Sequence, residues 1–433
     1  MRHGGYRPFD RDAGRDRLCA TGVLGYCLTR TDFLSPVWTS LALGLKTVDH
    51  SPQAKLLDLL VSILAGCRGI AQVNTRLRPD KVLARAWGRE QFAEQSTLTR
   101  TLDAFDGAAV GQLRQGSEAL FRRESLSLRH DFEQAWLWLD IDLSPLPISR
   151  HAESSTKGLQ ARRNQYGRQL ARVHAPSYHE TLFSHLYPGN QESSPAYQPT
   201  VAALDAFVGL TAAQKQRTVL RADAGFGSDA NINYALSHHW QVLTKNKGGR
   251  RPEALARQVA PADWLPLRPD RWVARAVQPP VYVRPTTCLV VRWLAQGGQV
   301  KHAVIVTSIL DWSLADIIAH YDDRGACETE IQADKSGLKL ERRRKKRLAA
   351  QEALVLLTDV AHNLLAWVSQ WMFPDQAPAS FGTTRLLEDV FQLPGRLLFD
   401  HDRLVEVHLN RLHPYAAPVA AGIHRLLTHF GNP

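Results

Sequence analysis

The segment from Arg217 to Lys247 limits the possible folds more than any other part of the chain. It begins with a short apolar strand, "TVLRAD", passes through a glycine-containing turn, "AGFGS", and enters a helix near Asp229. A second short strand, "WQVLTKNK", follows. Strands that alternate with a helix in this way are typical of a sheet covered by helices. We therefore expect an α/β fold.

The regions on either side differ in their patterns. Residues up to about 130 place apolar side chains at helical spacing, as in "QAKLLDLLVSILAG", and predict an all-helical region. Residues 250–310 are rich in Val and Thr with Pro and Gly-Gly breaks, which predicts several antiparallel strands. Beyond residue 313 the chain becomes helical again and stays so towards its end.

Acidic residues follow two predicted strands. "AWLWLDIDLSPLPI" predicts a buried strand that ends in Asp140 and Asp142, and Asp223 follows "TVLRA". Acids at the strand ends of an α/β core lie along one sheet edge, where sites form. A strand-end Asp is also a common turn former, and for Asp223 alone the turn is favoured. Asp140 and Asp142 share one strand face, and we prefer Asp142 because it lies nearer the end.

The charge of the chain favours a polyanionic partner. Its 433 residues include 53 Lys and Arg against 42 Asp and Glu, a net charge of +11. This excess favours nucleic acid over a membrane surface as the partner. From composition alone, a nucleic-acid partner and a merely basic protein are about equally plausible. The five Cys form no CxxC pair, so neither a zinc site nor a disulfide framework is predicted. No apolar run is long enough for a membrane helix, and we expect a cytoplasmic protein.

The stretch "YDDRGACETEIQADK", residues 321–335, places four functional groups on one face of a predicted helix. At about 100° per residue, Tyr321, Arg324, Glu328 and Lys335 fall within about 60° of one another. A solvated face with an Arg–Glu i,i+4 pair explains part of this pattern, but neither the Tyr nor the Lys. A carboxylate between cations suits a site for a divalent metal and phosphate. Further carboxylates would have to come from elsewhere in the chain.

Two basic segments are candidate phosphate contacts. "TKNKGGRR" contains Lys245 and Lys247, and "ERRRKKR" begins its cationic run with Arg342 and Arg343. Such clusters neutralise nucleic-acid phosphates in a salt-dependent way. A solvated surface is the usual alternative. We favour a DNA contact for the second segment, because it directly follows the predicted phosphate-binding helix.

These residues together resemble a known family. Residues 321–335 fit Y-x2-R-x3-E-x6-K, the signature of a group of bacterial insertion-sequence DDE transposases. "LDIDLS" and "RADAGFGS" resemble the family's two Asp motifs, and "AHNLLAWV" resembles the helix that follows its signature. The resemblance implies an α/β, RNase H-like catalytic core with a β-rich insertion and helical N-terminal and C-terminal regions. It also implies a division of the chain. Residues 1–130 would form a helical DNA-binding region, residues 131–248 the first part of the core, and residues 249–310 the insertion. Residues 311–372 would form the second part of the core, with the signature helix, and residues 373–433 a helical C-terminal region.

The resemblance also implies a catalytic mechanism. Asp142, Asp223 and Glu328 would form the DDE triad and bind two Mg²⁺ ions, for which Mn²⁺ substitutes. The metals would activate water or a DNA 3′-hydroxyl for attack on a phosphodiester. The cations and the phenol of the signature would hold backbone phosphates; these are Tyr321, Arg324 and Lys335.

The implied partners are double-stranded transposon ends and target DNA. A homodimer would bind them in a synaptic complex at the bacterial nucleoid, and no membrane is involved.

The chain departs from the family pattern after Asp142, where the Thr that often follows is missing. Trp293 and Trp312 are candidates for stacking on a flipped base, which leaves hairpin chemistry open. Two other functions remain: a transposase-derived DNA-binding protein that no longer cuts, and a stand-alone RNase H-like nuclease. The three acids argue against the first and the helical DNA-end regions against the second.

Overall fold

The computed structural model describes residues 18–45, 49–160, 163–374 and 376–433, except for the side chains of 326–328 and 377. The chain forms two compact units. The helical unit comprises Met1–Ser125, His151–Glu153 and Glu330–Pro433, and the sheet unit comprises Leu126–Arg150 and Ser154–Thr329. None of the helices in the described ranges is long and apolar enough to span a membrane.

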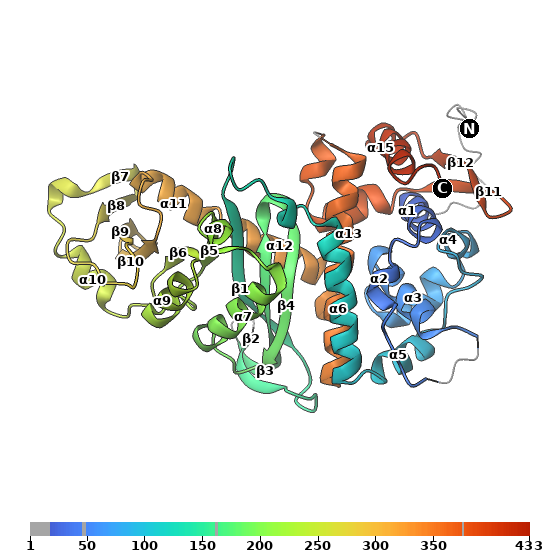
Figure 1. The fold of residues 1–433 in the computed structure, drawn as a ribbon, viewed down its shortest axis with the longest axis horizontal. Helices are drawn as coiled ribbons and strands as arrows, with labels where there is room; N and C mark the ends of the chain where they lie inside the picture. The colour runs from blue at the N-terminus through green and yellow to red at the C-terminus, as the bar shows by residue number, and fades with distance from the viewer. Residues whose placement is uncertain (1–17, 46–48, 161–162, 375) are drawn as a thin grey trace. The chain divides into compact units, whose positions relative to one another are not determined.

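The sheet unit is built on five core strands in the order β4-β3-β1-β5-β6. The parallel strands β1, β5 and β6 are flanked by β3, which runs antiparallel to β1, and by β4, which runs antiparallel to β3 (Figure 1). This order and direction of strands is that of an RNase H-like core, as predicted. The strands are β1 (Leu137–Pro147), β3 (Arg163–Ala175), β4 (Glu180–Pro188), β5 (Thr218–Ala222) and β6 (Gln241–Lys245), with the short β2 (Thr156–Gln160) also paired to β3.

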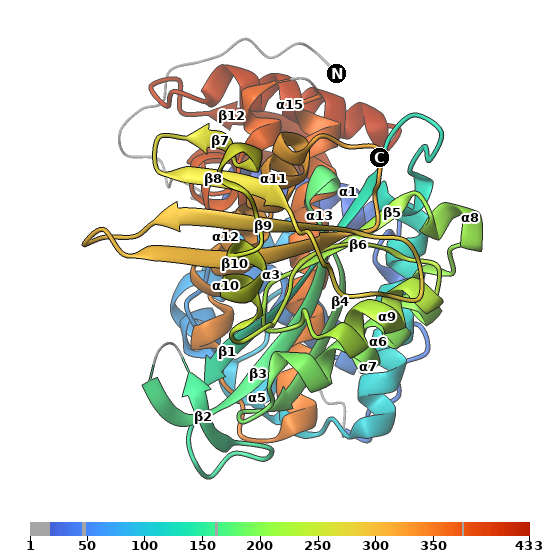
Figure 2. The ribbon, with the colours of Figure 1, turned by 90° about the vertical axis from the view of Figure 1, so that its left-hand side faces the viewer.

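The predicted β-rich insertion continues the same sheet. Strand β10 pairs with β6, and β9, β8 and β7 follow in an antiparallel series (Figure 2). The insertion therefore extends the core sheet to ten strands and does not form a sheet of its own. Its strands are β7 (Leu265–Arg268), β8 (Arg271–Arg275), β9 (Thr287–Leu294) and β10 (Val300–Thr307), and the helix α10 (Arg251–Ala256) precedes them.

Apolar residues explain why the helix α11 (Leu314–Asp322) covers one face of this sheet. Ile317 and Ile318 of α11 pack into a buried cluster with strand residues such as Val219 and Leu243. All five residues of β5 are buried, as expected for a parallel strand at the centre of a sheet. The other helices of the sheet unit are α7 (Ser193–Val208), α8 (Ala212–Lys215) and α9 (Asp229–Ser237).

The helical unit confirms the predicted helical regions, with one addition. Its long helix α13 (Leu348–Met372) is buried along most of its length and contacts α3, α5, α6 and α15. The C-terminal region was expected to be helical throughout, but it also contains a two-stranded sheet, β11 (Gly395–Asp400) with β12 (Arg403–Leu409). The remaining helices are α1 (Cys19–Arg30), α2 (Ser35–Trp38), α3 (Pro52–Leu64), α4 (Lys81–Ala86), α5 (Gln95–Asp103), α6 (Gly107–Glu124), α14 (Thr383–Arg385) and α15 (Ala416–His429).

Candidate active site

Strand β1 gives its two acidic residues different environments. Asp140 is fully buried, and both of its carboxylate oxygens accept hydrogen bonds from Arg221, at 2.6 Å from Nε and 2.8 Å from Nη2. Burial raises the pKa of Asp140 to about 6, although the charge and hydrogen bonds of Arg221 lower it. Asp142 is only half-buried. The pairing with Arg221 leaves Asp142 as the better candidate of the two for the predicted metal ligand.

The strand register brings Asp142 beside Asp223. The parallel ladder of β1 and β5 runs to the pair Ile141 and Ala222, and each Asp is the next residue of its chain. Neighbouring strands lie about 4.8 Å apart, so the register places the two acids at corresponding positions just beyond this ladder. Strand β1 was predicted to end near Asp142, but it continues to Pro147, because β3 pairs with it along this stretch. Here Arg172 of β3 lies opposite Asp142.

Asp223 also forms the turn that the sequence suggested. Its Oδ1 accepts a hydrogen bond from the backbone N–H of Gly225 at 2.8 Å, and its carbonyl accepts one from Phe226. The side chain is half-buried. The Gly225 bond involves one of the two carboxylate oxygens, so turn formation and metal binding are compatible.

The signature segment is not the single helix that its spacing predicted. Helix α11 ends at Asp322, and a new helix, α12 (Gly325–Ser336), begins three residues later. The Arg324 N–H bonds to the Tyr321 carbonyl, which tightens the last turn, and Gly325 has a low helix propensity. The break means that residues on α11 and α12 do not share one helical face by spacing alone.

The first half of the signature lies near Asp223. Burial raises the pKa of the Tyr321 phenol; the charge of Asp223 raises it further, whereas Arg324 lowers it by its charge and a hydrogen bond. Tyr321, Arg324 and Asp223 are therefore neighbours. The side chain of Glu328 lies outside the described residues. Lys335 is buried and belongs to the helical unit, so its place beside the acids remains a prediction.

Comparison with known proteins identifies the family. Residues 44–429 match the family model described as "Transposase DDE domain group 1". The chain belongs to this family. It is a DDE-type transposase, an enzyme of DNA transposition. A solved structure, "Cryo-EM structure of piggyBac transposase synaptic complex with hairpin DNA (SNHP)", is 12% identical over 86% of this chain and 81% of that chain, with a TM-score of 0.49. No curated protein matches the sequence.

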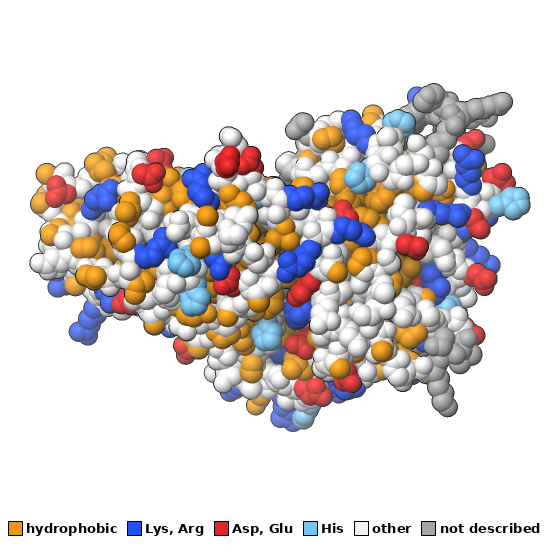
Figure 3. Space-filling view, in the orientation of Figure 1, with side chains coloured by type: hydrophobic (Ala, Val, Ile, Leu, Met, Phe, Trp, Pro, Cys, Tyr) orange, Lys and Arg blue, Asp and Glu red, His pale blue; other side chains and the backbone are white. Residues whose placement is uncertain are grey.

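The basic residues of the transposase differ in exposure. Lys247 and Arg342 are exposed, and each lies 3.8 Å from a glutamate, Glu192 and Glu341 respectively. Lys245 is half-buried at the end of β6, with its Nζ 5.6 Å from the centre of the Trp293 ring. On the face seen in Figure 3, Lys and Arg side chains are spread among acidic and neutral ones and form no single patch.

Arg343 of the transposase is buried, contrary to its predicted role as a surface phosphate contact. It is 2% exposed, and its guanidinium donates hydrogen bonds to the carbonyls of Ser62, at 3.0 Å, Cys67 and Leu338. Burial lowers its pKa to about 10. Arg343 therefore joins the last turn of α3 and the residues after it to the segment after α12, and we leave it out of the proposed DNA contacts.

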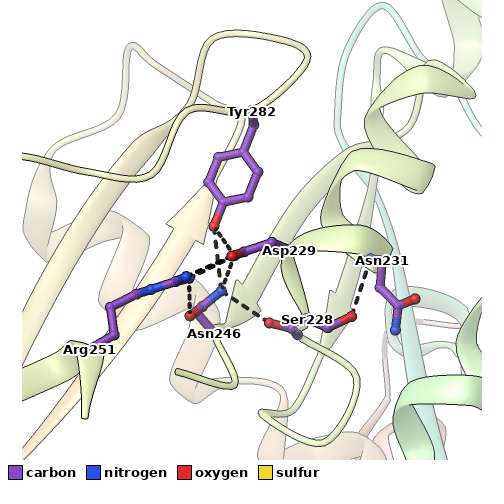
Figure 4. A network of polar contacts seen from close by, with 7 residues as sticks. Ser228, Asp229, Asn231, Asn246, Arg251 and Tyr282 are labelled. Atoms are coloured by element: carbon purple, nitrogen blue, oxygen red, sulfur yellow. Dashed lines mark hydrogen bonds and ion pairs between the residues drawn. The ribbon is translucent and has the colours of Figure 1, made fainter. Parts of the chain in front are cut away.

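The transposase sequence gave no signal for a polar network around Asp229, at the start of α9. Both carboxylate oxygens of Asp229 accept from Arg251, at 2.8 and 2.7 Å, and Oδ1 also accepts from Tyr282 and Asn246, each at 2.9 Å (Figure 4). These bonds lower the pKa of Asp229, and burial together with the bond to Asp229 raises the pKa of Tyr282. The network fixes the insertion loop that carries Tyr282 to the core.

Trp312, one of the two tryptophans considered for base stacking, packs within an aromatic cluster of the transposase. Its ring lies 5.8 Å from Trp136, 5.6 Å from Trp138 and 4.5 Å from His320. These contacts hold the start of α11 against β1. Packing accounts for Trp312, and its role with a flipped base remains an untested prediction.

Proposed function

We propose that this transposase cuts DNA at the ends of an insertion sequence and joins the freed 3′-ends to target DNA. The observation that carries the proposal is the position of Asp142 and Asp223 at the ends of the paired stretch of two neighbouring strands, with Tyr321 and Arg324 close to Asp223. We further propose that the chain is of the bacterial type with the Y-R-E-K signature and acts at the nucleoid.

The donor set fits hard divalent cations such as Mg²⁺ or Mn²⁺, which prefer carboxylate oxygens. Among the described side chains, no three His, Cys, Asp or Glu residues converge as a complete metal site. Asp142 and Asp223 would supply two ligands, and we propose Glu328 of α12 as the third. Two bound ions would polarise the phosphodiester and lower the pKa of the attacking hydroxyl or water.

The remaining signature residues would position the DNA backbone. The raised pKa of Tyr321 keeps its phenol protonated at neutral pH, so it can donate a hydrogen bond to a phosphate oxygen. Arg324 can offer a planar pair of donors, and Lys335 a point charge. Lys245, Lys247 and Arg342 would add salt-sensitive contacts along the duplex.

The partners follow from the reaction. Transposition joins two ends of one element to one target, so we propose that two copies of the transposase pair the ends in a synaptic complex. We assign recognition of the ends to the helical region 1–130, and the core in two parts, 131–248 and 311–372, to catalysis. The insertion 249–310 and the region 373–433 would support the complex.

The test is cleavage of a labelled duplex that carries the element's own terminal sequence. We expect nicking at the element's end with Mg²⁺, none with EDTA, and none with Glu328→Gln. Glu330→Gln removes the same charge from the same helix, two residues further on, and should retain cleavage. End binding without cleavage in any metal would favour the non-cutting DNA-binding protein. Cleavage without joining to target DNA would favour the stand-alone nuclease.

A further inference from the structure

One buried guanidinium connects the three segments that carry the site. Arg221 of β5 is 3% exposed and forms a two-pronged bond with Asp140 of β1. Its Nη1 donates to the backbone carbonyl of His320 in α11 at 2.7 Å. The guanidinium also lies 4.8 Å from the centre of the Trp138 ring, which stacks on the His320 imidazole.

Each contact of Arg221 lies close in sequence to a site residue. Asp140 precedes Asp142 by two residues on the same strand face, and Arg221 itself precedes Asp223 by two. His320 directly precedes Tyr321. A shift of any one segment would therefore break a bond to Arg221. The same bonds fix the spacing of the acids and of the phenol.

We propose that Arg221 is a positioning residue of the transposase. Arg221 holds the end of α11 against β1 and β5, and it pairs with Asp140 so that this carboxylate does not bind a metal. This inference rests on the proposed function of the site, and Asp140 is then not a metal ligand. Its carboxylate is neutralised by Arg221, so it does not compete with Asp142 for a cation. Tyr321 and Arg324 are in turn carried by a helix end whose last turn is bonded to the sheet.

Lysine cannot replace Arg221 in this role. A lysine ammonium is a point charge, whereas the three contacts around Arg221 require a planar fork and a third N–H in a fixed direction. Arg221→Lys keeps the positive charge beside Asp140 and loses this geometry. The substitution therefore separates positioning from charge balance.

A buried ion pair that only stabilises the fold is the alternative, and the chain contains a matched control. In the helical unit, Asp58 is fully buried and accepts from Arg89 Nε at 3.0 Å and from the backbone of Ala93 at 2.7 Å. Arg89→Lys makes the same chemical change at a pair that lies outside the sheet unit. Its effect on stability should resemble that of Arg221→Lys, without an effect on α11.

The experiment uses the full-length protein and two kinds of readout. Hydrogen exchange with mass spectrometry follows the amide protection of residues 314–322, with α13 as an internal reference. Cleavage of the labelled duplex gives the maximal rate and the Mg²⁺ concentration for half-maximal rate, and fluorescence anisotropy gives the affinity for the duplex.

For Arg221→Lys we expect lost protection in α11, unchanged protection in α13, and a maximal rate lower by about 10²-fold, since small misplacements of reacting groups have effects of this size. Affinity for the duplex should not change. Asp140→Asn should leave the half-saturating Mg²⁺ concentration unchanged. Arg89→Lys should change neither α11 protection nor the rate. If Arg221→Lys does not fold, the neutral double variant Asp140→Asn with Arg221→Gln replaces it, with the same expectations.

Wild-type protection of α11 in Arg221→Lys would overturn the proposal, as would an equal loss of rate in Arg89→Lys. A higher half-saturating Mg²⁺ concentration in Asp140→Asn would instead assign Asp140 to the metal. If the wild-type protein cleaves nothing in any metal, the proposed function fails, but the exchange data still decide whether Arg221 holds α11.

Discussion

The two basic segments, residues 245–251 and 341–347, look alike in sequence but use their cations differently. In the first, the half-buried Arg251 pairs with a carboxylate, Asp229. In the second, Arg343 is bonded to backbone carbonyls alone. The carboxylate raises the pKa of Arg251, whereas burial lowers that of Arg343. A run of charges in a sequence therefore does not reveal which of its members face solvent.

The two segments also differ in how many other donors serve the oxygen atoms that each arginine binds. Arg251 is about one-third exposed and shares Asp229 with Tyr282 and Asn246, so the loss of one donor leaves others in place. Arg343 is the common donor to three carbonyls of buried residues, Ser62 and Cys67 at or just after the end of α3 and Leu338 after α12. The second arrangement has less redundancy and should be the more sensitive to mutation.

The largest expected effect comes from Arg343→Met. The change leaves the carbonyls of Ser62, Cys67 and Leu338 buried without this donor, and the free energy of unfolding should fall by about 3 kcal/mol. Urea unfolding followed by circular dichroism measures it. The neighbouring Arg342→Met is the control and should change stability by less than about 0.5 kcal/mol, because its side chain is 70% exposed. Equal effects would remove the contrast between the two segments.

Much of the sheet unit was predictable, because strand patterns depend on local sequence. The apolar runs in "TVLRADAGFGS" and "WLWLDIDL" identify β1, β5 and the acids that follow, and the parallel pairing ends one residue before Asp142 and Asp223. The bonds of Arg221 and Arg343 were not predictable. Apart from Leu338, which lies five residues before Arg343, the partners are 81 residues or more away in sequence. Several of them are backbone carbonyls, which no side-chain pattern marks.

In the signature segment, helical spacing wrongly predicted one continuous helix, again because contacts between distant parts of the chain decide the structure. The positions of Tyr321, Arg324 and Glu328 fit one helix, but the helix is interrupted between the end of α11 and the start of α12. Asp322, the last residue of α11, is held by Arg271 of β8. Tertiary contacts of this kind override a periodicity that is compatible with several backbone paths. The β11–β12 pair was missed because its strands are short and their residues mostly exposed or half-buried.

A smaller effect is expected where the cation is paired with a carboxylate. Tyr282→Phe removes one of the donors to Asp229 and leaves the two bonds from Arg251, so stability should fall by about 1 kcal/mol. Urea unfolding again gives the value. Tyr166→Phe removes the same hydroxyl from an exposed tyrosine and should have no measurable effect. A loss at Tyr282 as large as that at Arg343 would show that the Asp229 network has no redundancy.

The exposed cations should affect DNA binding more than stability. Lys247→Ala and Arg342→Ala each remove one proposed phosphate contact, so the slope of log affinity against log salt should become shallower by about 0.9 for each. Fluorescence anisotropy with a terminal-sequence duplex, at several NaCl concentrations, measures the slope. Arg250→Ala and Arg344→Ala test one further exposed arginine of each segment. An unchanged slope in Lys247→Ala and Arg342→Ala would exclude both residues from the interface.

The smallest expected effect concerns His320, which resembles Arg343 in that burial disfavours its charged form. Burial lowers the pKa of His320 below 6.5; Arg221 acts in the same direction, and Asp323 and Asp316 oppose it. The unfolded chain then binds a proton before the native state does, so stability is lost as the pH falls below 6.5. His320→Phe keeps a ring against Trp138 and should flatten the dependence of melting temperature between pH 7 and pH 5. The exposed His401→Phe should retain the wild-type slope, and the same slope in both variants would contradict this assignment.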